Sequence, residues 1–402
     1  MELKYTVQNY DWGMKGTTSS VARLLKGSDP AAHVDEEKTY SELWMGTHPN
    51  GPSFVKATGE SLGEFIGANK EVLGDPVRES FGDDLPFLFK VLSVRKALSL
   101  QAHPDKARAE SLHKLHPDIY KDPNHKPEMP IALTPFEALC GFRPVPEIQN
   151  FLKKIPELCA VIGQGTVEDF ISSGETDPKP HLQKCLQGLL THNADSTAHE
   201  LKKFIDRLSE MSEPGREELN ARIMEKLHAD YPGDVGCFGL YFFNFITLQP
   251  GEALYLGANE PHAYISGDCM EIMSCSDNVV RAGLTPKLKD VDTLVEMLTY
   301  NCEAAELKRF KPVKEDDYSE VFRPPIKDFA VSKIELPPGT PSYALPPRNS
   351  AGILIIIEGS VEVNSQVYCP GSVLFIKANE QLSLNIRTKD GRTLMFEGFA
   401  NV

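Results

Sequence analysis

Gln101 and His103 are spaced two residues apart in a segment that alternates polar and apolar side chains. In an extended strand alternate side chains point to the same face, so both would project from the polar face together with Ser99. Pro104 ends the strand because it has no N–H for a sheet hydrogen bond. Glu128 then closes the proline-rich loop sequence H-K-P-E. Amide, imidazole and carboxylate groups in this pattern supply three of the four ligands that a divalent metal prefers.

An internal repeat suggests a fourth ligand. Residues 250–260 (PGEALYLGANE) and 370–380 (PGSVLFIKANE) share Pro, Gly, Leu, Ala, Asn and Glu in register, which predicts two related β-units. Two residues beyond the repeat, the first copy has His262 and the second has Leu382. Since a leucine is sufficient for the structure at this position of the second copy, we interpret His262 as a functional residue of the first copy. The alternative is a hydrogen-bonded histidine in a loop.

The candidate ligands combine two imidazole nitrogens with an amide oxygen and a carboxylate. Their positions are Gln101, His103, Glu128 and His262. Such a set suits zinc first, with iron, manganese or cobalt as alternatives. With one carboxylate, the ion keeps positive charge that can polarise a sugar oxygen. A Q-x-H pair alone is more often an ordinary polar strand face, so the prediction depends on the whole set.

Length and charge exclude several classes of protein. The 402 residues predict two or three domains, and the net charge of −15 argues against a nucleic-acid partner. An anionic substrate would therefore need positive groups gathered locally. The longest aliphatic run, residues 353–357, is far too short to span a bilayer, so we expect a cytoplasmic protein with no membrane association. The eight cysteines include no C-x-x-C pair, and we expect free thiols.

Hydrophobic periodicity predicts β-strands at both ends of the chain and helices between them. Helical spacing extends over residues 146–232, where T-A-H-E at 197–200 predicts a capping box, and a separate helix is expected over 105–116. We expect a mainly β fold with a helical insertion. The predicted units are a catalytic domain of residues 1–145 and 233–315, a helical domain of 146–232 and a C-terminal domain of 316–402.

Several long strings give the chain a family resemblance. It resembles the type I mannose-6-phosphate isomerases (phosphomannose isomerases), which are zinc enzymes of the cupin superfamily. The strings are NYDWG (9–13), ELWMGTHP (42–49), FLFKVLSVRKALSLQAHPDK (87–106), NHKPEM (124–129), GANEPHAY (257–264) and SDNVVRAGLTPK (276–287). The resemblance implies two cupin-type jelly-roll β-domains plus an α-helical domain. The helical insertion departs from the family in its short length.

The resemblance also implies a site. It assigns one Zn²⁺ per chain to the four candidate ligands and a catalytic role to Arg281. The pocket would be lined by Trp12, Lys90, Ser99, Lys126, Tyr264, Glu271, Asp277 and Lys287. The implied reaction interconverts mannose 6-phosphate and fructose 6-phosphate through a cis-enediol(ate), and it would feed GDP-mannose formation and mannose catabolism.

The chemistry leaves some roles open. Arg281 is too basic to accept a proton, so it would stabilise the enediolate or bind phosphate, while Ser99 could donate to phosphate. Lys126, Glu271 and a metal-bound water are alternative bases for the C–H proton. A metal-dependent cupin dioxygenase and a non-catalytic sugar-binding cupin are alternative functions. We expect a monomer whose partner is a phosphorylated hexose.

Overall fold

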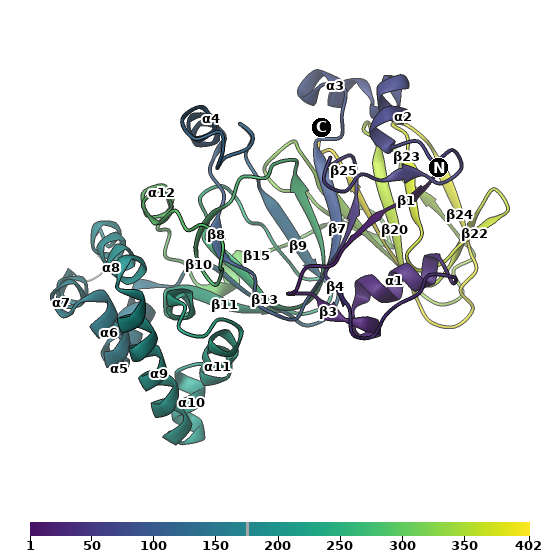
Figure 1. Ribbon diagram of the computed structural model, residues 1–402. Coiled ribbons are helices and arrows are strands. Elements are labelled where there is room, and N and C mark those ends of the chain that lie inside the picture. The colour runs from purple at the N-terminus through teal and green to yellow at the C-terminus, as the bar shows by residue number, and fades with distance from the viewer. Residues whose placement is uncertain (174–176) are drawn as a thin grey trace.

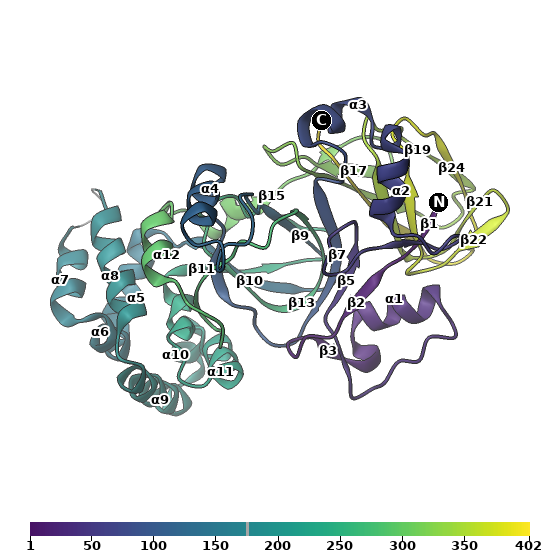
Figure 2. The ribbon, with the colours of Figure 1, turned by 45° about the horizontal axis from the view of Figure 1, so that its top comes forward.

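The computed structural model describes residues 1–173 and 177–402. A group of helices occupies one end of the molecule, sheets fill its centre, and a second group of strands formed mostly by the C-terminal residues lies at the other end (Figures 1 and 2). The expected β-rich architecture with a helical insertion is confirmed. All eight cysteines are free. Within the described residues, no helix combines the length and the apolar character needed to cross a membrane.

The central sheet has eleven antiparallel strands and carries the candidate ligands. Its main path runs in the order β15 (Arg309–Phe310), β12 (Ala253–Leu254), β9 (Glu128–Ala132), β13 (His262–Ser274), β7 (Phe87–Val94), β5 (Glu42–Met45) and β2 (Thr6–Gln8). The early part of β13 also pairs with β10 (Phe136–Phe142) and β8 (Leu100–Ala102), which in turn pair with β11 (Phe243–Leu248) and β14 (Val280–Gly283). The long strand β13 therefore joins both halves of this sheet.

The segment around β8 folds as its alternation predicts. Leu100 and Ala102 are buried in the apolar core on one side of the strand. Helix α4 (Lys106–Leu115) follows, and the Asp105 carboxylate accepts the Arg108 N–H at its first turn. The predicted helix over 105–116 is thus confirmed to within one residue.

The helical region contains seven helices among the described residues. They are α5 (Val145–Lys154), α6 (Pro156–Ile162), α7 (Gln164–Ser173), α8 (Lys179–Thr191), α9 (Ala194–Glu210), α10 (Glu213–Glu218) and α11 (Ala221–Asp230). The predicted capping box at 197–200 is wrong. Helix α9 begins one turn earlier, because the Asn193 side chain caps it by accepting the Ser196 N–H. Thr197 lies inside the helix, where its hydroxyl donates to the Asn193 carbonyl.

The C-terminal residues form most of an eight-stranded sheet, which packs against a second sheet of four strands. The larger has the order β16 (Val313–Lys314), β17 (Ser319–Phe322), β18 (Ala330–Leu336), β25 (Thr393–Phe399), β20 (Gly352–Glu358), β23 (Val373–Ile376), β1 (Glu2–Lys4) and β6 (Phe54–Val55). The smaller has the order β19 (Ser342–Leu345), β24 (Leu382–Ile386), β21 (Val361–Val363) and β22 (Gln366–Tyr368). An apolar core that includes Ile334, Leu354 and Leu384 draws residues from both sheets. Two strands from the N-terminal residues, β1 and β6, complete the larger sheet.

The remaining elements connect these sheets. They are β3 (Met14–Lys15), β4 (Thr39–Tyr40), α1 (Ser20–Ser28), α2 (Leu62–Ala68), α3 (Asp75–Phe81), α12 (Val291–Met297) and the short 3₁₀ helices η1 (Gly16–Thr18), η2 (Lys70–Leu73), η3 (Val235–Tyr241) and η4 (Ala305–Lys308).

The two copies of the sequence repeat share their backbone geometry. Gly251 and Gly371 have φ angles of 90° and 88°, and Asn259 and Asn379 have φ angles of 62° and 60°. Strands β12 and β23 lie between these turns, and β13 and β24 follow them. His262 and Leu382 are the first residues of β13 and β24. The repeat in sequence is therefore a repeat in structure.

A buried carboxylate in the C-terminal region predicts a pH-dependent stability. Glu397 in β25 is 1% exposed and lies 3.3 Å from Arg348 Nε, while burial raises its pKa to about 7 against the opposing charge of Arg348. Between pH 4.5 and 7 the folded chain then holds a proton that the unfolded chain loses. This contribution to stability is complete below about pH 4.5 and is lost as pH rises to 7, at a cost of about 3 kcal/mol.

The variant Glu397→Gln cannot ionise and should not show this loss. Urea denaturation at pH 5 and pH 8 measures the free energy of unfolding of the variant and of the wild type. The variant's value, relative to that of the wild type, should be higher at pH 8 than at pH 5. An equal difference at the two pH values would contradict the raised pKa.

Candidate functional site

Three buried side chains from three neighbouring strands converge in the central sheet. His103 follows β8, Glu128 begins β9 and His262 begins β13. Nε2 of His103 lies 3.3 Å from Oε1 of Glu128, and Nε2 of His262 lies 3.5 Å from Oε2 of Glu128. These ligand atoms all lie within 4.8 Å of one another, so a single metal ion could contact all three. We call this set the His–Glu–His cluster.

The backbone orients both imidazoles. Nδ1 of His103 donates to the Asn278 carbonyl at 2.8 Å, and Nδ1 of His262 donates to the Glu260 carbonyl at 3.0 Å. Because each Nδ1 carries the proton, each Nε2 is left with a lone pair directed into the cluster.

The donor set fits a divalent metal. Burial lowers the pKa of His103 to about 4, so its ring is neutral at physiological pH. Although burial alone would raise the pKa of Glu128, the neighbouring His103, His262 and Lys126 hold it well below its usual value. Within residues 1–173 and 177–402, the fully buried Nε2 of His103 has no hydrogen-bond partner. An unpartnered buried lone pair beside a carboxylate is what a metal ligand offers before the ion binds.

Gln101 lies beside the cluster. Its Nε2 is 3.4 Å from Nε2 of His262, and its Oε1 accepts a hydrogen bond of 2.6 Å from the Ser99 hydroxyl. A half-turn of the amide would place the oxygen at the cluster instead. Gln101 can therefore complete a set of four ligands.

Strand register brings Arg281 next to these groups. Arg281 in β14 pairs with Gln101 in β8, and Gln101 pairs with His262 in β13. Cross-strand partners are close neighbours on one sheet face, so these three side chains form a single row. Burial lowers the pKa of Arg281 from its ordinary value, and no carboxylate or hydrogen-bonding side chain among the described residues opposes that shift. A positive group therefore lies one strand from the candidate ligand Gln101.

A second row of cross-strand partners holds buried charges. Trp44, Lys90 and Glu271 are paired across β5, β7 and β13. Nζ of Lys90 lies 3.2 Å from Glu271 and 3.7 Å from Glu42. Burial would lower the pKa of Lys90, but the two carboxylates outweigh it and raise the pKa above its usual value. Lys90 is therefore a permanent cation and not a proton acceptor.

Glu271 is held from both sides. Its Oε2 faces Lys90, and its Oε1 accepts a hydrogen bond of 2.8 Å from the Tyr264 hydroxyl. Burial raises the pKa of Glu271 although the charge of Lys90 opposes the shift. A carboxylate with a raised pKa in a fixed orientation is suited to accept a proton.

The other predicted site residues lie around this centre. Lys126 Nζ is 3.6 Å from Glu128, and Asp277 is 3.4 Å from His48. Lys287 lies at the surface. Partial desolvation of its ammonium group, together with the nearby positive charges of Arg281 and Lys126, lowers its pKa. Trp12 packs against a core cluster that includes Tyr264. Of these residues, Lys126 contacts the His–Glu–His cluster directly through Glu128, and Lys287 lies within charge range of Lys126 and Arg281.

Sequence reasoning missed three residues that contact this set. Glu42 pairs with Lys90 and accepts a hydrogen bond from the Trp44 indole. The Lys90 ammonium lies 5.0 Å from the Trp44 ring, and His48 packs edge-on against the same ring. The alternation E-x-W in 42–44 was the available signal, because it places an acid and an aromatic residue on one strand face.

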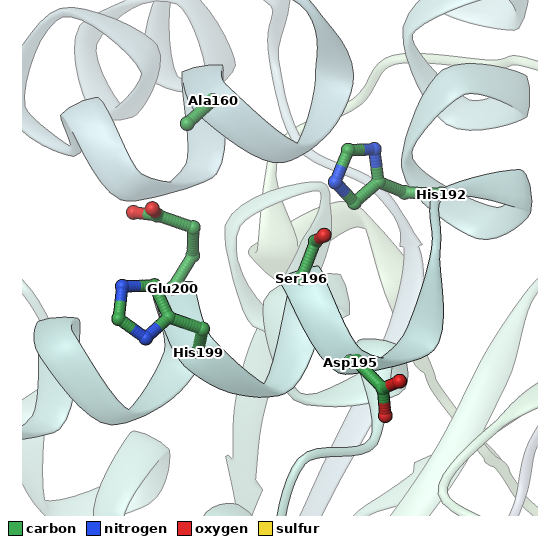
Figure 3. Close-up of a pocket in the computed structure, with 6 residues that line it drawn as sticks. All are labelled: Ala160, His192, Asp195, Ser196, His199 and Glu200. Carbon is green, nitrogen blue, oxygen red and sulfur yellow. The ribbon is translucent and has the colours of Figure 1, made fainter.

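Two other hollows lie away from the cluster. One, of about 360 Å³, lies in the helical region and is lined by Ala160, His192, Asp195, Ser196, His199 and Glu200 (Figure 3). The other, of about 330 Å³, lies where α1 meets the 133–134 turn and strands of the C-terminal sheet. Neither contains a predicted site residue.

Comparisons with known proteins agree on one family. The family model of the type I phosphomannose isomerase catalytic domain matches residues 1–145, and that of its helical insertion domain matches residues 161–243. Mannose-6-phosphate isomerase of Bos taurus is 46% identical over 400 residues, covering 96% of this chain and 95% of the relative. The Homo sapiens enzyme is 45% identical with the same coverage, and mannose-6-phosphate isomerase 1 of Arabidopsis thaliana is 40% identical, covering 95% of this chain and 90% of the relative.

Solved structures give the same result. The apo form of mannose 6-phosphate isomerase from Salmonella typhimurium superposes with a TM-score of 0.83 at 31% identity, covering 100% of this chain and 99% of the other. A mannose 6-phosphate isomerase bound with zinc and yttrium matches with the same TM-score, identity and coverage. The chain therefore belongs to the type I phosphomannose isomerase family, and it is an isomerase.

Proposed function

We propose that this isomerase interconverts mannose 6-phosphate and fructose 6-phosphate through a cis-enediol(ate), with one Zn²⁺ per chain. The observation that carries the proposal is the His–Glu–His cluster, which shares a sheet with Arg281 and with the oriented carboxylate of Glu271. Relatives that cover nearly the whole chain are mannose-6-phosphate isomerases, and one solved relative binds zinc.

Four side chains would hold the zinc ion, namely Gln101, His103, Glu128 and His262. When bound, the ion would supply positive charge that stabilises the negative charge developing on the sugar oxygens during the reaction. The chemistry at carbon is then the task of the protein's own residues.

Glu271 is the proposed carbon base. Its carboxylate takes the proton from C2 of the open-chain sugar. The C–H electron pair becomes the C1=C2 double bond, and the carbonyl electrons move to O1. Lys90 and Tyr264 hold Glu271 in place. The pKa of each is raised, so each keeps its own proton and cannot accept the one from C2. Return of the proton to C1 completes the conversion of aldose to ketose.

Lys126 and Arg281 serve the oxygens. The Lys126 ammonium gives a proton to O1 and then takes the proton from O2, so charge and protons balance. The Arg281 guanidinium stabilises the enediolate oxygen through N–H donors, since no carboxylate or hydrogen-bonding side chain among the described residues offsets its burial. Lys287 and Ser99 bind the phosphate, with Lys287 supplying the charge that an anionic substrate needs in an acidic protein.

A coupled assay for fructose 6-phosphate formation tests this proposal. Purified protein should turn over mannose 6-phosphate, a chelator should abolish turnover, and added zinc should restore it. Oxygen uptake in place of isomerisation would indicate the dioxygenase alternative. Sugar binding without turnover by the zinc-loaded protein would indicate a sugar-binding cupin.

The amide ligand makes a specific prediction. Gln101→Leu keeps the size of the side chain but offers no oxygen, so zinc content by elemental analysis should fall below one per chain and turnover should fall with it. Circular dichroism should match that of the wild type. Unchanged zinc content and turnover would remove Gln101 from the ligand set.

The wider organisation is part of the same proposal. We infer two cupin-type jelly-roll domains, one catalytic (1–145 and 233–315) and one C-terminal (316–402), with a helical domain (146–232) between them. Strands β1 and β6 come from the N-terminal residues but pair within the C-terminal sheet, which supports tight association of the two β-domains. A monomeric cytoplasmic enzyme that feeds GDP-mannose formation and mannose catabolism fits this reading.

A further inference from the structure

The chain adopts an unusual backbone conformation three residues after Arg281. Leu284 has a φ angle of 53°, in the left-handed region that a leucine rarely adopts, and it is fully buried. The pairing of β14 with β8 also shifts register between Arg281 and Gly283, which indicates a β-bulge. Such a conformation persists only where the surroundings hold it.

Asp234 provides that hold. Its Oδ1 accepts the N–H of Leu284 at 2.8 Å and the N–H of Gly236 at 2.7 Å, and its Oδ2 accepts a hydrogen bond of 2.8 Å from Lys289 Nζ. Asp234 caps the 3₁₀ helix η3, directly after the last helix of the helical region, α11. One carboxylate thus connects the end of the helical region to the segment that follows Arg281.

The two backbones touch at this point. A Cβ added to Gly283 would lie 2.5 Å from Cα of Gly236, and one added to Gly236 would lie 2.6 Å from N of Leu284. No side chain fits between these segments, so the Asp234 hydrogen bonds act on backbone atoms already in contact. A small change at Asp234 would therefore reach residues 283–284 directly.

The segment from 282 to 289 is a closed loop that carries Lys287. The N–H of Asp290 donates to the Arg281 carbonyl at 3.0 Å and closes the loop. Lys287 is near enough to Arg281 and Lys126 for their charges to lower its pKa. We propose that Asp234 is a positioning residue that, through the Leu284 amide, holds Arg281 and Lys287 together so that they bind the substrate phosphate end and the reacting oxygens at once.

This inference rests on the proposed function, because it assigns Asp234 to the binding of a phosphorylated sugar. In Asp234→Ala, both amides lose their acceptor and the loop can relax from the left-handed conformation. The Michaelis constant for mannose 6-phosphate should rise by about tenfold or more, and the inhibition constant of inorganic phosphate should rise in parallel. Zinc content should stay at the wild-type value, because the metal ligands lie on other elements.

Two matched variants separate the backbone acceptor from the ion pair. Lys289→Ala removes the ion pair but leaves both amide bonds, and Asp234→Asn keeps an oxygen acceptor while it loses the charge. Both should keep Michaelis constants within about threefold of the wild type. If Asp234→Asn behaves like Asp234→Ala, or if Lys289→Ala does, the charge and not the amide acceptor is responsible and the proposal is overturned.

Hydrogen exchange gives a readout that does not depend on activity. In the wild type the Leu284 amide should be protected like its neighbours in β14, and in Asp234→Ala the amides of 282–289 should exchange faster while those of β7 and β13 do not. A rapidly exchanging Leu284 amide in the wild type would overturn the proposal even if Asp234→Ala fails to fold. An absence of turnover in the wild type would instead refute the proposed function, whereas wild-type kinetics in folded Asp234→Ala would refute only the role of Asp234.

Discussion

Replacing Arg281 with lysine should lower turnover of mannose 6-phosphate by about 30- to 1,000-fold, while the Michaelis constant stays within a few-fold. The lysine keeps the charge but loses the planar guanidinium, whose N–H donors would contact the enediolate oxygen. Loss of one such donor costs about 2–4 kcal/mol of transition-state stabilisation. Because that contact strengthens only as charge develops, the substrate complex should be little affected. Steady-state kinetics on the folded variant measure both constants.

The outcome distinguishes three roles for Arg281. If the guanidinium only held phosphate, the Michaelis constant would rise and turnover would change little. Unfolding would mean that Arg281 is structural, although no charged partner among the described residues offsets the burial of its side chain. Lys287→Met is the matched comparison. It removes a charge from the same loop and should raise the Michaelis constant more than it lowers turnover.

His262→Leu should abolish zinc binding and lower turnover at least about 1,000-fold, because it removes one of three converging ligands from the His–Glu–His cluster. The fold should survive, since the second copy of the repeat has Leu382 at the equivalent position with the same turn geometry. Elemental analysis, circular dichroism and the coupled assay measure the three effects.

The reverse substitution is the matched control. Leu382→His places an imidazole in the C-terminal copy, and it should neither add a second zinc ion nor change turnover. Retention of zinc and turnover in His262→Leu would remove His262 from the ligand set. Loss of zinc in Leu382→His would contradict the assignment of the metal to the first copy alone.

Local sequence patterns predicted the parts of the site that lie in single segments. Alternation at 99–103 predicted that Gln101 in β8 and His103 just after it point to the same side, and Pro104 marked the end of the extended segment. The offset between His262 and Leu382 was visible because two copies of one turn could be aligned. These signals depend on neighbours in sequence, where strand and turn preferences act directly.

Features that depend on strand pairing could not be predicted in this way. Glu42 looked like an ordinary polar residue until β5 was found next to β7, which places its carboxylate beside Lys90. The addition of β1 to the C-terminal sheet depends on pairs such as Glu2 with Leu374 and Leu3 with Val373, which are far apart in the sequence. The start of α9 was misplaced because Asn193, which lies one turn before Thr197 and is equally suited to cap a helix, is the residue that accepts the first-turn N–H.

Zinc titration of metal-free protein tests the central claim most directly. Turnover of mannose 6-phosphate should be absent at the start, rise linearly with added zinc and stop at one equivalent per chain. The Gln101→Leu and His262→Leu variants should stay far below this value at the same zinc concentrations. Full turnover before zinc is added, or a rise that continues to two equivalents, would contradict a single catalytic zinc site.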